Sequence, residues 1–139
     1  MHPTIKRFQA SVAEGEEAAI AELLAEDVVF RPPTYFATWA GRDAVSAVLG
    51  HVGQVFENFH YRRILGDKKD WALEFQAKVS GLDCVGVDLV TLNDAGLVAE
   101  FEVVMRPYKT IGALREAMNA RVATDARFLK FKDNLQSGG

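Results

Sequence analysis

Cysteine is nearly absent from this chain of 139 residues, and Cys84 is the only one. A single cysteine forms no internal disulfide, and neither a CxxC zinc site nor a redox pair can be built from it. We therefore expect a reducing, cytoplasmic environment. The opening residues lack a basic flank followed by an apolar run, and no window has the roughly 20 apolar residues of a membrane span. We expect neither export nor membrane insertion.

Several patterns that carry chemistry are also missing. The chain has no GxSxG, no phosphate-binding loop and no Ser/His/Asp arrangement, so hydrolase and nucleotide chemistry lack support. His2 and His60 show no ligand spacing to each other or to a carboxylate pair, which argues against a metal site. The net charge of -3 argues against a nucleic-acid surface, which needs a basic face. We expect no cofactor, metal, nucleic acid or membrane as a partner.

The length and composition are those of one ordinary globular domain. Of the 139 residues, 49% are apolar and 25% are charged. A domain of this size buries roughly 70% of its unfolded surface, which allows a core and a cavity. We expect a single domain over residues 1–122. Residues 123–139 are expected to form a C-terminal extension that ends in a flexible glycine tail.

Hydrophobic periodicity changes from helical to strand-like along the chain. Apolar residues recur at spacings of three and four in segments near residues 3–14, 16–24, 43–57 and 110–122, which predicts helices there. Alternating patterns predict strands over residues 28–30, 59–65, 71–80, 84–92 and 97–106. Grouped helices followed by sequential strands are typical of the α+β class. We predict a cone, in which three N-terminal helices wrap a curved antiparallel sheet and a C-terminal helix follows.

The rest of the chain is organised around the hairpin over residues 84–107. The tetrapeptide NDAG joins its two strands, and Gly96 supplies the left-handed turn position. In the second strand the alternation places Phe101 and Val103 on the core face. It places Val98 with Glu100 on the opposite face.

Asp88 is the only charge in the first strand of this hairpin, and both faces of that strand carry apolar side chains. A carboxylate in such a strand either finds strong partners or is driven toward its neutral form, since burial disfavours the ionised state. Asp88 is therefore a candidate acid. The alternative is a structural carboxylate bonded to a neighbouring strand or to a Trp or Tyr side chain, and the residues leave both interpretations open.

The order of elements and the wording of three segments resemble a known superfamily. The segments are LLAEDVVF, WAGRDAV and GVDLVTLNDAGLVAEFEVVMRP. They resemble the superfamily of nuclear transport factor 2 (NTF2), ketosteroid isomerase and SnoaL-like polyketide cyclases, over roughly residues 4–122. The resemblance implies an NTF2-like cone with an apolar conical pocket and a homodimer.

The resemblance also implies a role for Asp88. In ketosteroid isomerases an aspartate eight residues before the hairpin glycine donates a hydrogen bond to the substrate oxyanion, and here that spacing from Gly96 reaches Asp88. Two other residues of that catalytic set are missing. Phe8 stands where the family has its oxyanion tyrosine, and Pro32 stands where it has the general base. Ketosteroid isomerisation itself is therefore not expected.

The candidate site combines two catalytic candidates with an apolar lining. Asp88 is the acid or oxyanion partner. His51, at the margin of a helical apolar stripe, is the best candidate for a base, although such a histidine is often merely packed or solvated. Tyr35 is a second possible donor, on a segment whose aromatic side chains wrap a core or roof a pocket. The predicted lining comprises Phe8, Phe30, Tyr35, Trp39, Leu49, Val52, Trp71, Phe75, Phe101, Val103 and Met105.

Three hypotheses of different classes follow. The first is a cofactor-free isomerase, lyase or cyclase that acts on a small, largely apolar carbonyl compound. The second is a non-catalytic protein that binds a small hydrophobic metabolite. The third is a dimeric interaction module of the NTF2 type, which works through its outer surface.

Overall fold

A computed structural model describes residues 1–136, and the expected flexible glycine tail lies outside them. The helices are α1 (Pro3–Glu14), α2 (Glu17–Leu23), α3 (Arg42–Val55), α4 (Tyr108–Val122), α5 (Phe128–Phe131) and the 3-10 helix η1 (Lys132–Asn134). The strands are β1 (Leu24–Arg31), β2 (Thr38–Ala40), β3 (Glu57–Asp67), β4 (Asp70–Val79), β5 (Leu82–Leu92), β6 (Val98–Arg106) and β7 (Leu135–Gln136).

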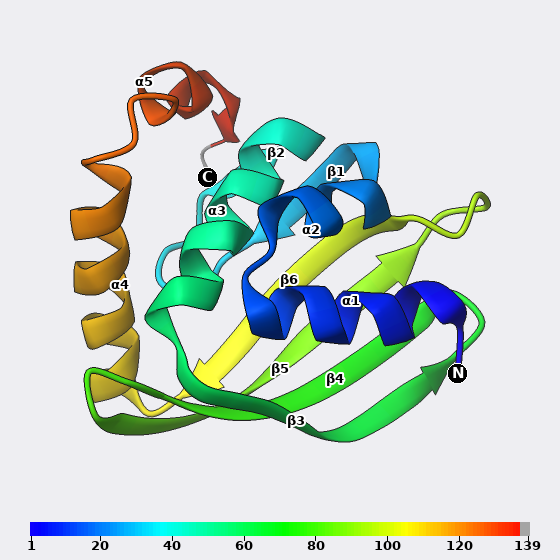
Figure 1. Ribbon diagram of the computed structural model, residues 1–139. Helices are drawn as coiled ribbons and strands as arrows, with labels where there is room; N and C mark the ends of the chain where they lie inside the picture. The colour runs from blue at the N-terminus through cyan, green and yellow to red at the C-terminus, as the bar shows by residue number, and fades with distance from the viewer. Residues whose placement is uncertain (137–139) are drawn as a thin grey trace.

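The strands form one strongly curved sheet in the order β3-β4-β5-β6-β1-β2-β7. Helices α1, α2 and α3 lie on its concave side, and α4 stands at one end of the sheet (Figure 1). The predicted α+β cone, with three N-terminal helices and a C-terminal helix, is confirmed. Within the described residues no helix is long and apolar enough to cross a membrane.

The sheet is larger than the sequence pattern predicted. The short strand expected at residues 28–30 is the end of β1, which pairs in parallel with β6. Its first half does not alternate, because Leu24 and Ala25 are both buried while Glu26 and Asp27 are both exposed. A register shift between Leu24 and Val29 accounts for this irregular pattern. Strands β2 and β7 and helix α5 were not predicted, because they are too short to show a period.

The hairpin between β5 and β6 has the expected turn. Gly96 adopts φ 76, and the Asn93 carboxamide oxygen accepts hydrogen bonds from the N–H groups of Ala95 and Leu97, each at 3.0 Å. The face predicted for Val98 is wrong, because Val98 is fully buried. The register of the pair shifts between Thr91 and Leu92, and the extra residue in β6 turns Val98 toward the core.

The core lies between the concave face of the sheet and the helices. Phe8 of α1 packs edge-on against Phe101 of β6, with ring centroids 5.1 Å apart, and Phe30 of β1 lies at the same distance on the ring of Phe101. Gly86 in β5 leaves room for Phe75 of β4, since a Cβ atom there would lie 2.4 Å from the Phe75 ring. Aromatic side chains thus pack together at the centre of a core whose other members are largely aliphatic.

Candidate functional site

Asp88 lies on the inner face of β5, in the middle of the sheet. In the strand register it stands between Leu73 of β4 and Val103 of β6, and only 3% of its surface is exposed. Its neighbours on the same face of β5, Gly86 and Val90, are also buried. The predicted burial of this carboxyl in apolar surroundings is therefore correct.

Tyr61 of β3 supplies the partner of Asp88. Its hydroxyl donates a hydrogen bond to Asp88 Oδ2 at 2.8 Å. Tyr61 is two strands away, and it pairs with Phe75 of β4, which in turn pairs with Gly86. The curvature of the sheet and the missing side chain at Gly86 allow this reach across the concave face. No other group in residues 1–136 hydrogen-bonds to the carboxyl, so Oδ1 has no protein partner there.

The protonation states of this pair follow from burial. Desolvation raises the pKa of Asp88 to about 7, although the hydrogen bond from Tyr61 acts in the opposite direction. Desolvation also raises the pKa of Tyr61 well above its ordinary value, and the neighbouring Asp88 adds to this. Tyr61 therefore keeps its proton and donates a hydrogen bond to Oδ2. Below a pH of about 7 the Asp88 carboxyl is mainly protonated, and its proton lies on Oδ1 because Oδ2 accepts from Tyr61.

A small cavity lies in front of this carboxyl. This inner chamber has a volume of about 30 Å³, enough for one small group such as a carbonyl oxygen. Its lining consists of Val12, Phe30, Pro33, Leu49, Val52, Phe56, Phe59, Phe75, Asp88, Phe101, Val103 and Leu114. Among these residues Asp88 is the only one with a polar side chain.

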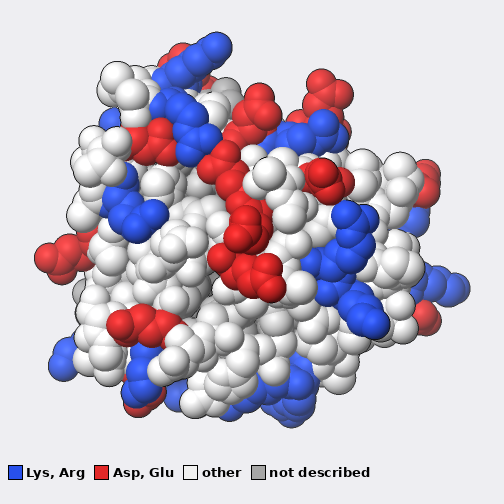
Figure 2. Space-filling model, viewed as in Figure 1, with Lys and Arg blue, Asp and Glu red and all other residues white. Residues whose placement is uncertain are grey.

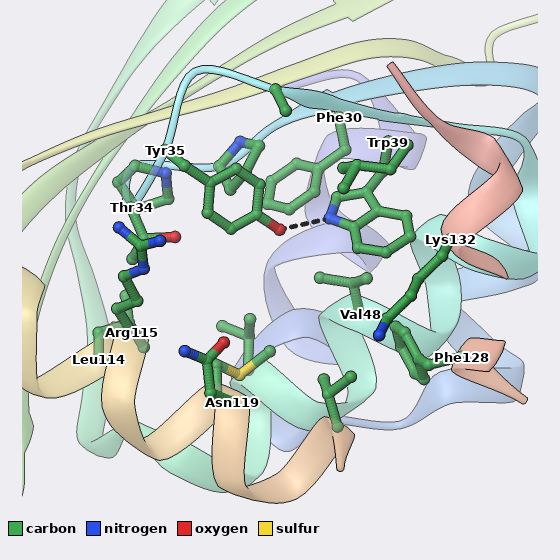
Figure 3. A pocket seen from close by; sticks show the side chains of 17 residues that line it. Phe30, Thr34, Tyr35, Trp39, Val48, Leu114, Arg115, Asn119, Phe128 and Lys132 are labelled. Carbon is green, nitrogen blue, oxygen red and sulfur yellow. Dashed lines mark hydrogen bonds between the residues drawn. The ribbon is translucent and has the colours of Figure 1, made fainter. Parts of the chain in front are cut away.

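A larger cavity, the outer pocket, adjoins the inner chamber (Figure 3). Its volume of about 480 Å³ falls within the range of small-molecule sites. The outer pocket is lined by Phe30, Pro32, Pro33, Thr34, Tyr35, Ala37, Trp39, Val48, Val52, Leu114, Arg115, Met118, Asn119, Val122, Phe128, Lys132 and Leu135. Phe30, Pro33, Val52 and Leu114 line both cavities and form the partition between them.

Tyr35 and Trp39 form the polar part of the pocket wall opposite α4. The Trp39 indole N–H donates a hydrogen bond to the Tyr35 hydroxyl at 2.7 Å, so the hydroxyl proton of Tyr35 is available to a ligand (Figure 3). Burial raises the pKa of Tyr35, which keeps that proton in place. The guanidinium of Arg115 lies 6.0 Å from the centre of the Tyr35 ring.

Most of the predicted lining residues lie on these two cavities. Tyr35 and Trp39 line the outer pocket, Leu49, Phe75, Phe101 and Val103 line the inner chamber, and Phe30 and Val52 line both. Tyr35 and Trp39 of the aromatic segment are thus found at the outer pocket. Phe36 of the same segment is 81% exposed, so the prediction that its aromatic side chains are covered is wrong for this residue.

Phe8, Trp71 and Met105 lie elsewhere. Phe8 is fully buried against Phe101, because α1 lies directly on the sheet. The Trp71 indole N–H donates to the Lys68 carbonyl at 3.0 Å, which holds the ring at a separate shallow depression beside the β3–β4 hairpin. Met105 lines another shallow depression, together with Val103. These three side chains are corrections to the predicted lining.

His51 lies outside both cavities, in a charged network. Its Nε2 is 2.9 Å from Asp125 Oδ2, and its Nδ1 accepts a hydrogen bond from Arg121 at 3.1 Å. The proton of the neutral ring therefore resides on Nε2. Arg127 pairs with the same Asp125 carboxyl at 2.7 Å and with Glu17 of α2 at 2.7 Å. Both nitrogens of His51 are occupied, so a role as base stays a prediction that these contacts do not favour.

The sequence reasoning missed two parts of the site. The alternation around Tyr61 predicts a strand and nothing about a functional role. The only signal for its role was the alternative in which Asp88 bonds to a Trp or Tyr side chain. The C-terminal segment (residues 123–136) was expected to be an extension, yet Phe128, Lys132 and Leu135 line the outer pocket. Strand β7 of this segment pairs with β2, which brings it to the pocket. Among the described residues no three His, Cys, Asp or Glu side chains gather as a metal site.

Comparisons with known proteins agree with this architecture. A family model described as a SnoaL-like domain matches residues 5–101. A crystal structure of an uncharacterised protein with a cystatin-like fold from Silicibacter pomeroyi is 70% identical, with a TM-score of 0.97, and covers 98% of this chain and 96% of that chain. A comparison with curated proteins gives no match.

Two further crystal structures are informative. A steroid delta-isomerase from Pseudomonas aeruginosa is 35% identical, with a TM-score of 0.82 and coverage of 87% of this chain and 90% of that chain. An NTF2-like protein of unknown function from Burkholderia xenovorans shares the fold at 20% identity and a TM-score of 0.66, with coverage of 76% and 82%. The similarity to NTF2-like and ketosteroid-isomerase-like proteins that the sequence suggested is confirmed.

Proposed function

Because the chain belongs to the SnoaL-like family, we propose that its cavities bind a small, largely apolar carbonyl compound and that Asp88 acts on the carbonyl oxygen. The activity is that of an isomerase, lyase or cyclase that needs no cofactor. The similarity to a steroid delta-isomerase supports this class of reaction. The observation that carries the proposal is the Asp88 carboxyl itself, buried at the closed end of an apolar cavity and bonded only to Tyr61.

The geometry supports an acid role for this carboxyl. Tyr61 occupies Oδ2, so the proton on Oδ1 is left to meet a carbonyl oxygen in the inner chamber. A hydrogen bond from a neutral acid in an apolar site stabilises the negative charge that develops on this oxygen when a solvent or buffer base takes a proton from the adjacent carbon. Because Asp88 donates only in its protonated form, activity decreases as the pH increases through about 7.

Deuterium exchange tests this proposal without knowledge of the natural substrate. A panel of apolar ketones is incubated with the protein in D2O, and proton NMR records exchange at the carbon next to the carbonyl group. We expect exchange above the buffer rate for at least one ketone, and a loss of at least about 100-fold in Asp88→Ala, which leaves no donor at this position. Asp83→Ala is the matched control, because Asp83 lies on the same strand with 75% of its side chain exposed. No exchange by the wild type, or equal exchange by Asp88→Ala, contradicts the proposal.

A non-catalytic binding protein is the second candidate. Asp88 is the only titratable side chain of the inner chamber, and the described lining of the outer pocket adds only Tyr35, Arg115 and Lys132. Apart from Asp88, to which the acid role is assigned, these lining residues include no histidine and no carboxylate that could serve as the base. Ketones that bind, as measured by calorimetry, but undergo no exchange would favour this function.

We also propose that the protein forms a homodimer through the outer face of the sheet. Leu65, Leu89 and Val104 are exposed there by 62%, 43% and 54%. In the strand register Leu65 and Leu89 both pair with Ala72, so these three residues form one row across β3, β4 and β5. Val104 lies on β6, next to this row, two residues beyond the Glu102 that pairs with Leu89. Burial of such a row supports association. Sedimentation should give a dimer for the wild type and a monomer for Leu89→Lys, and a monomeric wild type would reject this interface.

A cytoplasmic location completes the proposal. The one cysteine, Cys84, is buried and free, which fits a reducing compartment.

A further inference from the structure

The outer pocket is well supplied with hydrogen-bond donors and cations. Arg115 of α4 and Lys132 of η1 lie on opposite sides of it, and the Asn119 side chain lies between them (Figure 3). The Tyr35 hydroxyl accepts from Trp39 and has its own proton to donate. A ligand that satisfies these groups must carry hydrogen-bond acceptors at this end.

No acidic side chain balances these cations. Among the described residues that line the outer pocket, none is Asp or Glu, although the whole chain has a net charge of -3. Within residues 1–136 the ion pairs of the protein involve other basic side chains, and neither Arg115 nor Lys132 takes part in one. The face shown in Figure 2 carries both acidic and basic side chains, with the acidic ones gathered in a stripe near its centre.

The positions of these cations suit a ligand that is apolar at one end. The partition toward the inner chamber consists of Phe30, Pro33, Val52 and Leu114, whereas Arg115 and Lys132 are exposed at the solvent side of the pocket. A molecule that places its apolar body against the partition therefore leaves its other end between the two cations. A carboxylate there keeps contact with water, which avoids the cost of burying a charge.

We propose that the ligand of this pocket is an apolar molecule that carries one carboxylate, held by Arg115 and Lys132 at the outer end. This inference rests on the proposed function, and it adds the substrate class: a carbonyl compound with an acidic tail. Arg115 is the stronger partner, because its guanidinium lies over the Tyr35 ring and Tyr35 can donate to the same carboxylate.

Matched pairs of probes test the charge preference. Calorimetry compares 2-naphthoate with 2-naphthamide, and 4-phenylbutanoate with 4-phenylbutanamide, because each amide keeps the shape of its acid without the charge. We expect the carboxylate of at least one pair to bind about tenfold more tightly than its amide, as two partly exposed charge contacts allow. The double variant Arg115→Gln/Lys132→Gln should bring this ratio close to one without weakening the amide. Lys130→Gln is the control, since Lys130 is exposed on α5 and does not line the pocket.

Three results would overturn the inference: equal binding of acid and amide in both pairs, no binding by any probe at millimolar concentration, or a preference that persists in the double variant. A preference that survives in 1 M NaCl as strongly as in 0.1 M NaCl would also contradict it, because salt screens charges at the rim of a pocket. Asp88→Ala, which has no donor at this position, separates this inference from the proposed catalysis. That variant should retain the full preference for the carboxylate while it loses deuterium exchange, so either idea can fail alone.

Discussion

Replacement of Asp88 by Asn should change the stability of the protein by an amount that depends on pH. The folded protein holds the Asp88 proton up to a pKa of about 7, whereas the unfolded chain releases it near 3.8. Between these values the folded state binds more protons than the unfolded state, so the free energy of unfolding of the wild type decreases as the pH increases. The amide in the variant does not titrate and can still accept the hydrogen bond from Tyr61.

The magnitude follows from the same two pKa values. Each tenfold change in a protonation equilibrium corresponds to about 1.4 kcal/mol. The wild type therefore loses about 4 kcal/mol in total as the pH increases from below 4 to above 7, most of it before neutrality. Over the accessible interval from pH 5 to pH 8, the difference between Asp88→Asn and the wild type should change by about 2–3 kcal/mol in favour of the variant.

Urea unfolding at several pH values measures this difference. All other titrating groups contribute equally to both proteins, so they cancel in the comparison. Asp83→Asn should show no such trend, because its side chain is 75% exposed. Carbon-13 NMR of the Asp88 carboxyl provides an independent measurement of its pKa. A change below about 0.5 kcal/mol from pH 5 to pH 8, together with an ordinary carboxyl pKa, would refute the argument that burial controls this residue.

Three further predictions concern the neighbours of Asp88 and the cover of the pocket. Tyr61→Phe removes the hydrogen bond that opposes desolvation, so carbon-13 NMR should show the pKa of Asp88 above about 7, and a lower value would contradict the assigned donor. Gly86→Ala should cost about 1–3 kcal/mol in urea unfolding, because the added methyl group meets the Phe75 ring; an unchanged midpoint would show that the ring moves freely. Arg127→Gln removes the contacts with Glu17 of α2 that hold the C-terminal segment, so amide hydrogen exchange in this segment should become about fivefold faster. An unchanged exchange rate would show that apolar contacts alone hold the segment.

The location of the acid could be predicted, but its partner could not. A lone carboxylate in a strand whose two faces are both apolar indicates burial. Gly96 marks the turn from which the position of this carboxylate is counted. The partner, Tyr61, comes from a strand whose register shifts between Tyr61 and Ile64. Such a bulge changes which side chains meet across the sheet, and it has no signature in a single sequence.

The sequence by itself determined the secondary structure of most of the chain, the α+β cone and the burial of Asp88, because hydrophobic period and turn residues are local properties. Only the tertiary structure decided which buried groups meet. In the folded chain Tyr61 contacts Asp88 from two strands away, whereas Phe8 and Trp71 lie outside the two cavities. Phe128 and Lys132 line the outer pocket. These outcomes depend on strand register, sheet curvature and the packing of segments far apart in the chain, and periodicity encodes none of them.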